Sequence, residues 1–123
     1  MRLLLDTHAF LWWNFGDPKL PQRLRHEIQS KQNAVFVSAV SVWGIAIKKA
    51  SGKLSFDLPI GKAIQGHGFY SLPISVENAE WAGALPSIHR DPFDRLLVAQ
   101  AQMEGLTLVT VDQQILQYQV PHL

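Results

Sequence analysis

The 123-residue sequence contains no cysteine, and this absence restricts the sites that it can build. Disulfide bonds and thiolate metal ligands are excluded, so a bound metal ion would be held by oxygen or imidazole groups. Charged residues make up 17% of the chain and hydrophobic residues 47%, as in an ordinary globular protein. No apolar run approaches the roughly 18 residues of a membrane span, because Asp6 interrupts the leucines at positions 3 to 5. We therefore expect one domain over residues 1–123, a cytoplasmic location and no membrane partner.

Several catalytic motifs are absent as well. The sequence has no GxGxxG, no GxxxxGKS or GxxxxGKT, no GxSxG and no HExxH. Dinucleotide binding, P-loop hydrolysis, serine hydrolysis and zinc proteolysis therefore have no support. A small nucleotide-binding α/β protein is an alternative that the missing glycine-rich loop disfavours.

Short apolar runs alternate with helical patterns along the chain. They predict strands at residues 2–5, 34–37, 70–74 and 107–111, and helices after Asp6, over 21–31, after Ser38, over 60–66, after Ser75, from Asp91 to Gly105 and over 112–118. Alternation of this kind predicts an α/β fold, with a parallel sheet flanked by helices on both faces. In such folds ligands bind outside the carboxyl ends of the strands.

Charge is distributed unevenly although the net charge is only +1. The segment from Lys19 to Lys62 is strongly basic, and the segment from Glu77 to Asp112 is acidic. The common explanation is that these residues lie on solvated helix faces. The more specific one is a basic track for a phosphate backbone beside an acidic metal pocket.

Three aspartates are expected to meet at the carboxyl edge of the sheet. Asp6 and Asp112 each follow the last apolar residue of a predicted strand, and Asp94 lies in the first turn of the helix that Asp91 caps. Taken singly, each of them could simply cap a helix or complement its dipole. Because clustered carboxylates repel one another unless a cation holds them, their convergence favours a Mg²⁺ or Mn²⁺ site of the kind used in phosphodiester chemistry.

The histidines and tryptophans give weaker signals. His8, His67 and His89 are isolated in the sequence and are expected to be structural, although His8 and His89 lie close enough to acids to touch a phosphate. The four tryptophans fall on helical stripes, which predicts core packing before base stacking.

The helix predicted after Ser38 contains an unexpected residue, Gly44. A glycine inside a helix costs about 1 kcal/mol relative to alanine. Either a close approach of another group requires it, or another residue once stood there.

Four segments together resemble the PIN-domain ribonucleases, in particular the VapC toxins of bacterial toxin–antitoxin pairs. They are LLLDTHAFLWW, SAVSVWGIAIKKASGKL, HRDPFDRLLVAQA and LVTVD, in this order over nearly the whole chain. The resemblance implies an α/β/α sandwich, a Mg²⁺- or Mn²⁺-dependent endoribonuclease acting on structured RNA, a homodimer, and a cognate antitoxin that blocks the site.

The resemblance also assigns the site residues. It places the family's acidic cluster, as catalytic and metal-binding residues, on Asp6, Asp94 and Asp112, with Asp91 and Thr110 in support. Relatives have a W-E-I-A sequence where this chain has Gly44 between Trp43 and Ile45, so Gly44 occupies the position of an expected catalytic glutamate.

Two functional hypotheses follow. In the first, the protein is a toxin ribonuclease that inhibits translation, weakened here by Gly44, with the RNA backbone positioned by Lys48, Lys49, Arg90 and Arg95. In the second, it is a catalytically inactive PIN-like module that binds RNA or an antitoxin. Gly44 favours the second hypothesis, and metal-dependent RNA cleavage would separate the two.

Overall fold

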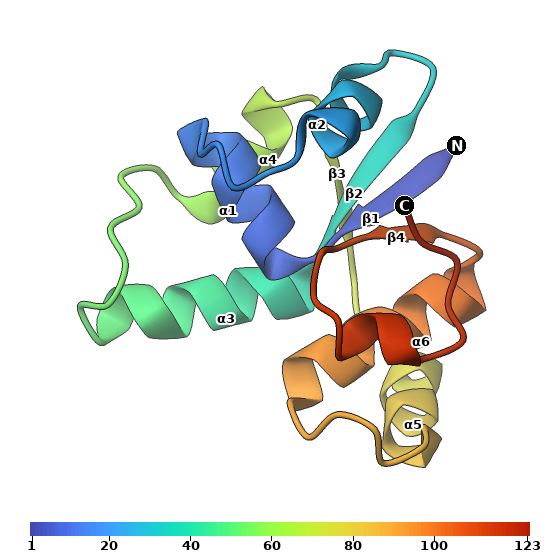
Figure 1. The fold of residues 1–123 in the computed structure, drawn as a ribbon. Coiled ribbons are helices and arrows are strands. Elements are labelled where there is room, and N and C mark those ends of the chain that lie inside the picture. Colours follow the sequence, from blue (N-terminus) through green and yellow to red (C-terminus); the bar gives the residue numbers. More distant parts are fainter.

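The computed structural model describes all residues from Met1 to Leu123 and contains a four-stranded parallel sheet. The strands lie in the order β3 (Tyr70–Leu72), β2 (Ala34–Ser38), β1 (Arg2–Leu5) and β4 (Thr107–Val109). β1 is therefore central, paired with β2 on one side and β4 on the other. All carboxyl ends point the same way, and the two inner strands bring their following residues to one edge (Figure 1).

Successive leucines of β1 face two different cores, as the pleat of a strand requires. Leu3 and Leu5 belong to one hydrophobic cluster and Leu4 to the other. The first cluster lies under α1 (Thr7–Phe15), α2 (Gln22–Gln29), α4 (Ile60–Gly66) and part of α3 (Ala39–Ala50). The second lies under α6 (Pro92–Glu104), against which α5 (Val76–Ala84) packs. The predicted α/β sandwich with helices on both faces is confirmed.

Most helix boundaries follow from their caps. Ser75 accepts a bond from the backbone of Asn78 in a complete capping box, and Asp91 caps α6 with Pro92 at the first helical position. Gly105 ends α6 in the left-handed conformation, with φ 66°, as predicted. The helix predicted over 21–31 is shorter, because Pro21 is its N-cap and Ser30 is already extended.

The C-terminal segment differs from its prediction. The helix expected over 112–118 is only a short 3-10 turn, η1 (Ile115–Gln117), and β4 ends at Val109 rather than at residue 111. The chain turns back instead, so that Leu123 donates its N–H to the carbonyl of Leu108 at 3.1 Å. No helix in the structure has both the length and the apolar character that crossing a membrane requires.

Candidate active site

Asp6 is the deepest acid of the site. It follows β1 directly, caps α1 by accepting the N–H of Ala9 at 2.7 Å, and is only 4% exposed. The hydroxyl of Thr110 donates to its second carboxylate oxygen. Burial raises the pKa of Asp6 above its ordinary value, while these two hydrogen bonds oppose the shift. Asp6 is thus a buried carboxylate whose negative charge is only partly compensated within the protein.

Thr110 links Asp6 to the next acid. The same hydroxyl that donates to Asp6 accepts the backbone N–H of Asp112 at 3.0 Å. Asp112 therefore lies at the edge of the site although it comes three residues after the end of β4, not directly after the strand as expected. The polar support predicted for Thr110 corresponds to these two bonds.

Asp94 projects from the first turn of α6 and is bound by a histidine. Nε2 of His89 lies 2.9 Å from Oδ2 of Asp94. Burial raises the pKa of Asp94, the bond to His89 opposes that rise, and the negative charges of Asp91 and Asp112 add to it. Asp91 itself is occupied in capping α6 through the N–H of Phe93 at 2.8 Å.

Three side chains could share one metal ion. Ligand atoms of His89, Asp94 and Asp112 all lie within 4.8 Å of one another. Asp6 is outside this group, but its charge interacts with that of Asp94 and it lines the same cavity. His89 is isolated in the sequence, and a ligand on a loop has no periodicity that would reveal it. Its position five residues before Asp94 was the available signal.

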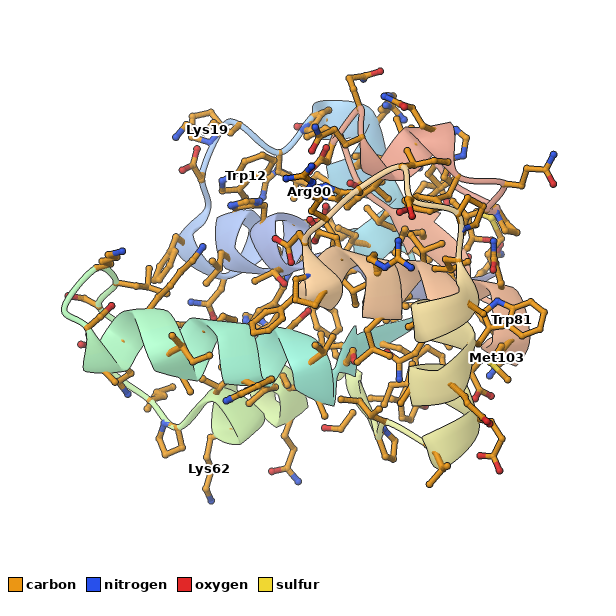
Figure 2. The ribbon with its side chains drawn as sticks, turned by 90° about the horizontal axis from the view of Figure 1, so that it is seen from below. Trp12, Lys19, Lys62, Trp81, Arg90 and Met103 are labelled. Carbon is orange, nitrogen blue, oxygen red and sulfur yellow. The ribbon has the colours of Figure 1, made fainter.

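The cavity has a volume of about 530 Å³ and is lined by both acidic and cationic side chains. Its lining includes Asp6, Asp91, Asp94 and Asp112 with the cations Lys48 and Arg90. Figure 2 shows Arg90 on the loop that precedes α6. Lys49, the other lysine expected to bind RNA, is exposed on α3 and does not line the cavity.

Arg95, which is expected from the sequence to bind RNA, is bonded extensively within the protein. Its guanidinium donates to the backbone carbonyls of Ala82, Leu85, Pro86 and His89, at 2.8 to 3.3 Å, and to the hydroxyl of Tyr118. These bonds use the donors that a phosphate would need. Arg95 therefore fastens the loop between α5 and α6, and its expected contact with RNA stays a prediction.

Gly44 is approached closely by an aromatic ring. A Cβ at this position would lie 2.9 Å from Cδ2 of Phe93, a contact that requires the ring to move. The Phe93 ring stacks on Trp43, with centroids 5.1 Å apart. Of the two explanations for Gly44, a close approach is therefore present, and Gly44 also lines the cavity where a longer side chain would enter it.

Comparison with known proteins agrees with this geometry. Residues 3–121 match the PIN domain family. The chain belongs to the PIN domain family. This PIN domain is 28% identical over 122 residues to ribonuclease VapC22 of Mycobacterium tuberculosis, an alignment that covers 97% of this chain and 93% of the relative. The predicted resemblance to PIN domains is thereby confirmed.

Solved structures share the fold of this PIN domain. VapBC2 from Rickettsia felis, bound to a DNA fragment from its promoter, matches with a TM-score of 0.73 and 15% identity, covering 100% of this chain and 98% of that one. FitAcB from Neisseria gonorrhoeae matches with a TM-score of 0.65 and 17% identity over 98% and 95% of the two chains. A toxin–antitoxin complex from Klebsiella pneumoniae gives a TM-score of 0.65 at 19% identity, over 98% and 95% of the chains. At these identities the likeness establishes the fold.

Proposed function

We propose that this PIN domain is a metal-dependent endoribonuclease and the toxin of a toxin–antitoxin pair, acting on structured RNA to inhibit translation. The observation that carries the proposal is the convergence of His89, Asp94 and Asp112 within 4.8 Å, beside the buried Asp6, at the binding edge of the sheet. The likeness to ribonuclease VapC22 over nearly the whole chain supports the same activity.

The donor set fits a hard divalent cation. Carboxylate oxygens with one imidazole suit Mg²⁺ or Mn²⁺, and the absence of cysteine leaves no thiolate ligand for a softer metal. The raised pKa values of Asp6 and Asp94 show that their charges are poorly compensated within the protein. A cation would provide that compensation. Asp6, Asp94 and Asp112 would hold it, with His89 as a further ligand or as the group that orients Asp94.

The protein's own groups supply positioning. Thr110 fixes the carboxylate of Asp6 and the backbone of Asp112, and His89 fixes Asp94. Lys48 and Arg90, at the cavity wall, would place a phosphodiester against the acids. When bound, the cation supplies water activation and stabilises charge on the leaving oxygen.

The proposed partners are an RNA substrate, a cognate antitoxin protein and a second copy of the chain. The structural neighbours in Rickettsia felis and Klebsiella pneumoniae are toxin–antitoxin assemblies, which supports an antitoxin here. The exposed apolar side chains Trp43 and Ile47 lie beside the cavity, where an apolar segment could dock and cover it. Light scattering should show a dimer alone and a larger complex with antitoxin; a monomer unchanged by antitoxin would contradict this.

A second candidate is a catalytically inactive PIN module that binds RNA or antitoxin. It is favoured by Gly44, which stands where a glutamate is expected from the resemblance and whose neighbouring space the Phe93 ring fills. The deciding experiment is cleavage of a structured RNA with Mg²⁺ or Mn²⁺, with EDTA and with Asp94→Asn as controls. Cleavage that both controls abolish supports the enzyme, whereas RNA binding without cleavage supports the module.

A further inference from the structure

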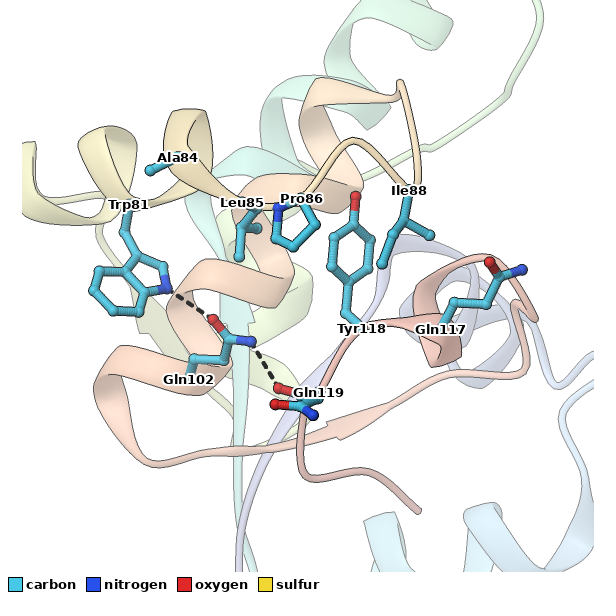
Figure 3. A pocket seen from close by; sticks show the side chains of 9 residues that line it. All are labelled: Trp81, Ala84, Leu85, Pro86, Ile88, Gln102, Gln117, Tyr118 and Gln119. Atoms are coloured by element: carbon cyan, nitrogen blue, oxygen red, sulfur yellow. Dashed lines mark hydrogen bonds between the residues drawn. The ribbon is translucent and has the colours of Figure 1, made fainter.

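A second cavity, of about 520 Å³, lies away from the acids between α5, α6 and the segment that follows η1. Figure 3 shows Trp81 and Tyr118 on its two sides, with Leu85 and Pro86 between them. No charged side chain lines it. Its walls are aromatic, aliphatic and amide groups only.

The indole of Trp81 is held in place by its own N–H. Nε1 donates to Oε1 of Gln102 at 2.7 Å, and Nε2 of Gln102 donates to the carbonyl of Gln119 at 2.7 Å (Figure 3). The ring is nonetheless 49% exposed. An exposed indole fixed at its edge offers a flat face for stacking with little loss of side-chain freedom.

The same cavity carries amide groups without partners in the protein. The side chains of Gln117 and Gln119 line it, are exposed, and make no hydrogen bond within the chain. Each amide offers both donors and an acceptor. A purely apolar segment would bury these groups unpaired, which is costly, whereas a planar ligand with polar edges would satisfy them.

The loop between α5 and α6 connects this cavity to the candidate active site. Ile88 lines the second cavity, His89 and Arg90 line a further cavity of about 440 Å³, and Arg90 and Asp91 line the active site. The backbone N–H of His89 donates to the hydroxyl of Tyr118 at 2.9 Å. Residues 88 to 91 of this loop thus run from the wall of the second cavity to the wall of the active site.

We propose that this second cavity binds one nucleobase of the substrate RNA, stacked on Trp81 and bonded at its edge by Gln117 or Gln119. The inference rests on the proposed function, since it takes the strand in the active site to be RNA. A lining without charged side chains disfavours a phosphate or carboxylate as the occupant, and the stacking face with free amides matches a base. Trp81 is therefore a substrate-binding residue outside the catalytic cluster.

The first test uses mononucleotides and does not depend on cleavage. The indole N–H signal of Trp81 in a ¹⁵N-labelled protein, assigned with Trp81→Phe, is followed during titration with adenosine, guanosine, cytidine and uridine monophosphates. At least one should shift this signal, while ribose 5-phosphate, which has no base, should not. The double variant Gln117→Leu with Gln119→Leu should weaken the shift. If none of the four moves the signal, the inference is overturned.

The second test separates binding from chemistry. Trp81→Ala should raise KM for RNA by about tenfold or more, the range of one base–aromatic stack, with kcat nearly unchanged. An RNA with an abasic nucleotide at the contacted position should lose the same factor with the unsubstituted protein and nothing further with the variant. Unchanged KM overturns the inference.

Two further outcomes distinguish a failure of the base-binding inference from a failure of the proposed nuclease function. If Trp81→Ala alters the oligomeric state or antitoxin binding while nucleotide binding is unaffected, the surface contacts a protein and the inference is wrong. If nucleotides shift the Trp81 signal but no RNA is cleaved with any metal, the base site stands and the proposed nuclease function fails.

Discussion

At the scale of single residues, the site consists of acids that the fold alone does not neutralise. Burial raises the pKa of Asp94, and the charges of Asp91 and Asp112 add to the effect. We therefore expect Asp94→Asn to increase the free energy of unfolding at neutral pH without metal. The same change should reduce the rise in melting temperature that Mn²⁺ produces, because one ligand is lost. Asp57→Asn, an equal charge change at an exposed position, is the matched control and should leave the Mn²⁺ effect intact. Identical Mn²⁺ binding in an Asn variant of Asp6, Asp94 and Asp112 together would place the metal elsewhere.

Gly44 allows a paired prediction. Gly44→Ala gains up to about 1 kcal/mol of helix propensity but forces the Phe93 ring to move, an overpacking cost of about 1–3 kcal/mol. It should therefore lower the free energy of unfolding in urea, whereas Gly83→Ala in α5, with nothing within 4 Å, should raise it. Equal effects of the two changes would show that the Phe93 contact has no energetic role.

Restoring a carboxylate tests the function of the same position. Gly44→Glu should make stability more dependent on metal, because a further acid enters the cavity. If the glutamate acts in acid–base catalysis, RNA cleavage should rise by about 10²-fold or more. Unchanged cleavage and unchanged host growth in a folded variant would favour the inactive module.

The place of a residue in the site could be predicted where the residue lies at a strand end or in the first turn of a helix. Asp6 follows a strand, and Asp94 sits in a first helical turn, so the sequence pattern placed both at the binding edge of the sheet. His89 and Arg95 show the limit. A sequence shows the charge of Arg95 but not the carbonyls of the α5–α6 loop that it binds, and these come together only after folding.

At the scale of secondary-structure elements, the helices could be predicted because their capping residues are local. The C-terminal segment after β4 could not be predicted, because contacts with distant residues determine its conformation. Ser75 and Asp91 bond to backbone groups two or three residues away, so local sequence contains the information. The segment after β4 is shaped instead by the bond from Leu123 to Leu108, a contact between distant residues. The helical pattern over residues 112–118 contains no information about such a long-range contact, which overrides local helix propensity.

The conformation of the loop between α5 and α6 depends on the hydrogen bonds of Arg95. A change of Arg95 should therefore destabilise the packing of α5 and α6. Arg95→Lys keeps the charge but cannot reproduce the planar fork that reaches four carbonyls and Tyr118. We expect a loss of about 3 kcal/mol in the free energy of unfolding, from several charge-assisted hydrogen bonds, measured by urea denaturation. Arg23→Lys, at an exposed position, is the control. A loss no larger than that of the control would contradict the structural role of Arg95.

At the scale of the whole molecule, the buried acids predict how stability responds to pH. The pKa values of Asp6 and Asp94 are raised above 3.8 in the folded state, so the folded protein holds these protons more tightly than the unfolded chain. Stability from this source is present at low pH and is lost as pH rises through the folded pKa values. His67 acts oppositely, because burial lowers its pKa below 6.5 and protonation destabilises the fold as pH falls.

The difference in unfolding free energy between the protein and Asp94→Asn isolates the contribution of Asp94. Without metal, the advantage of the variant should shrink on acidification; an advantage independent of pH would contradict the assignment.

The measurement that tests the central claim most directly is cleavage of a structured RNA by the purified chain, with Mn²⁺ and with EDTA, beside Asp94→Asn and the Asp57→Asn control. We expect cleavage that requires Mn²⁺, disappears in Asp94→Asn and survives in Asp57→Asn. Equal cleavage by the chain and Asp94→Asn, or cleavage that persists in EDTA, would contradict a metal-dependent nuclease site built on Asp6, Asp94 and Asp112.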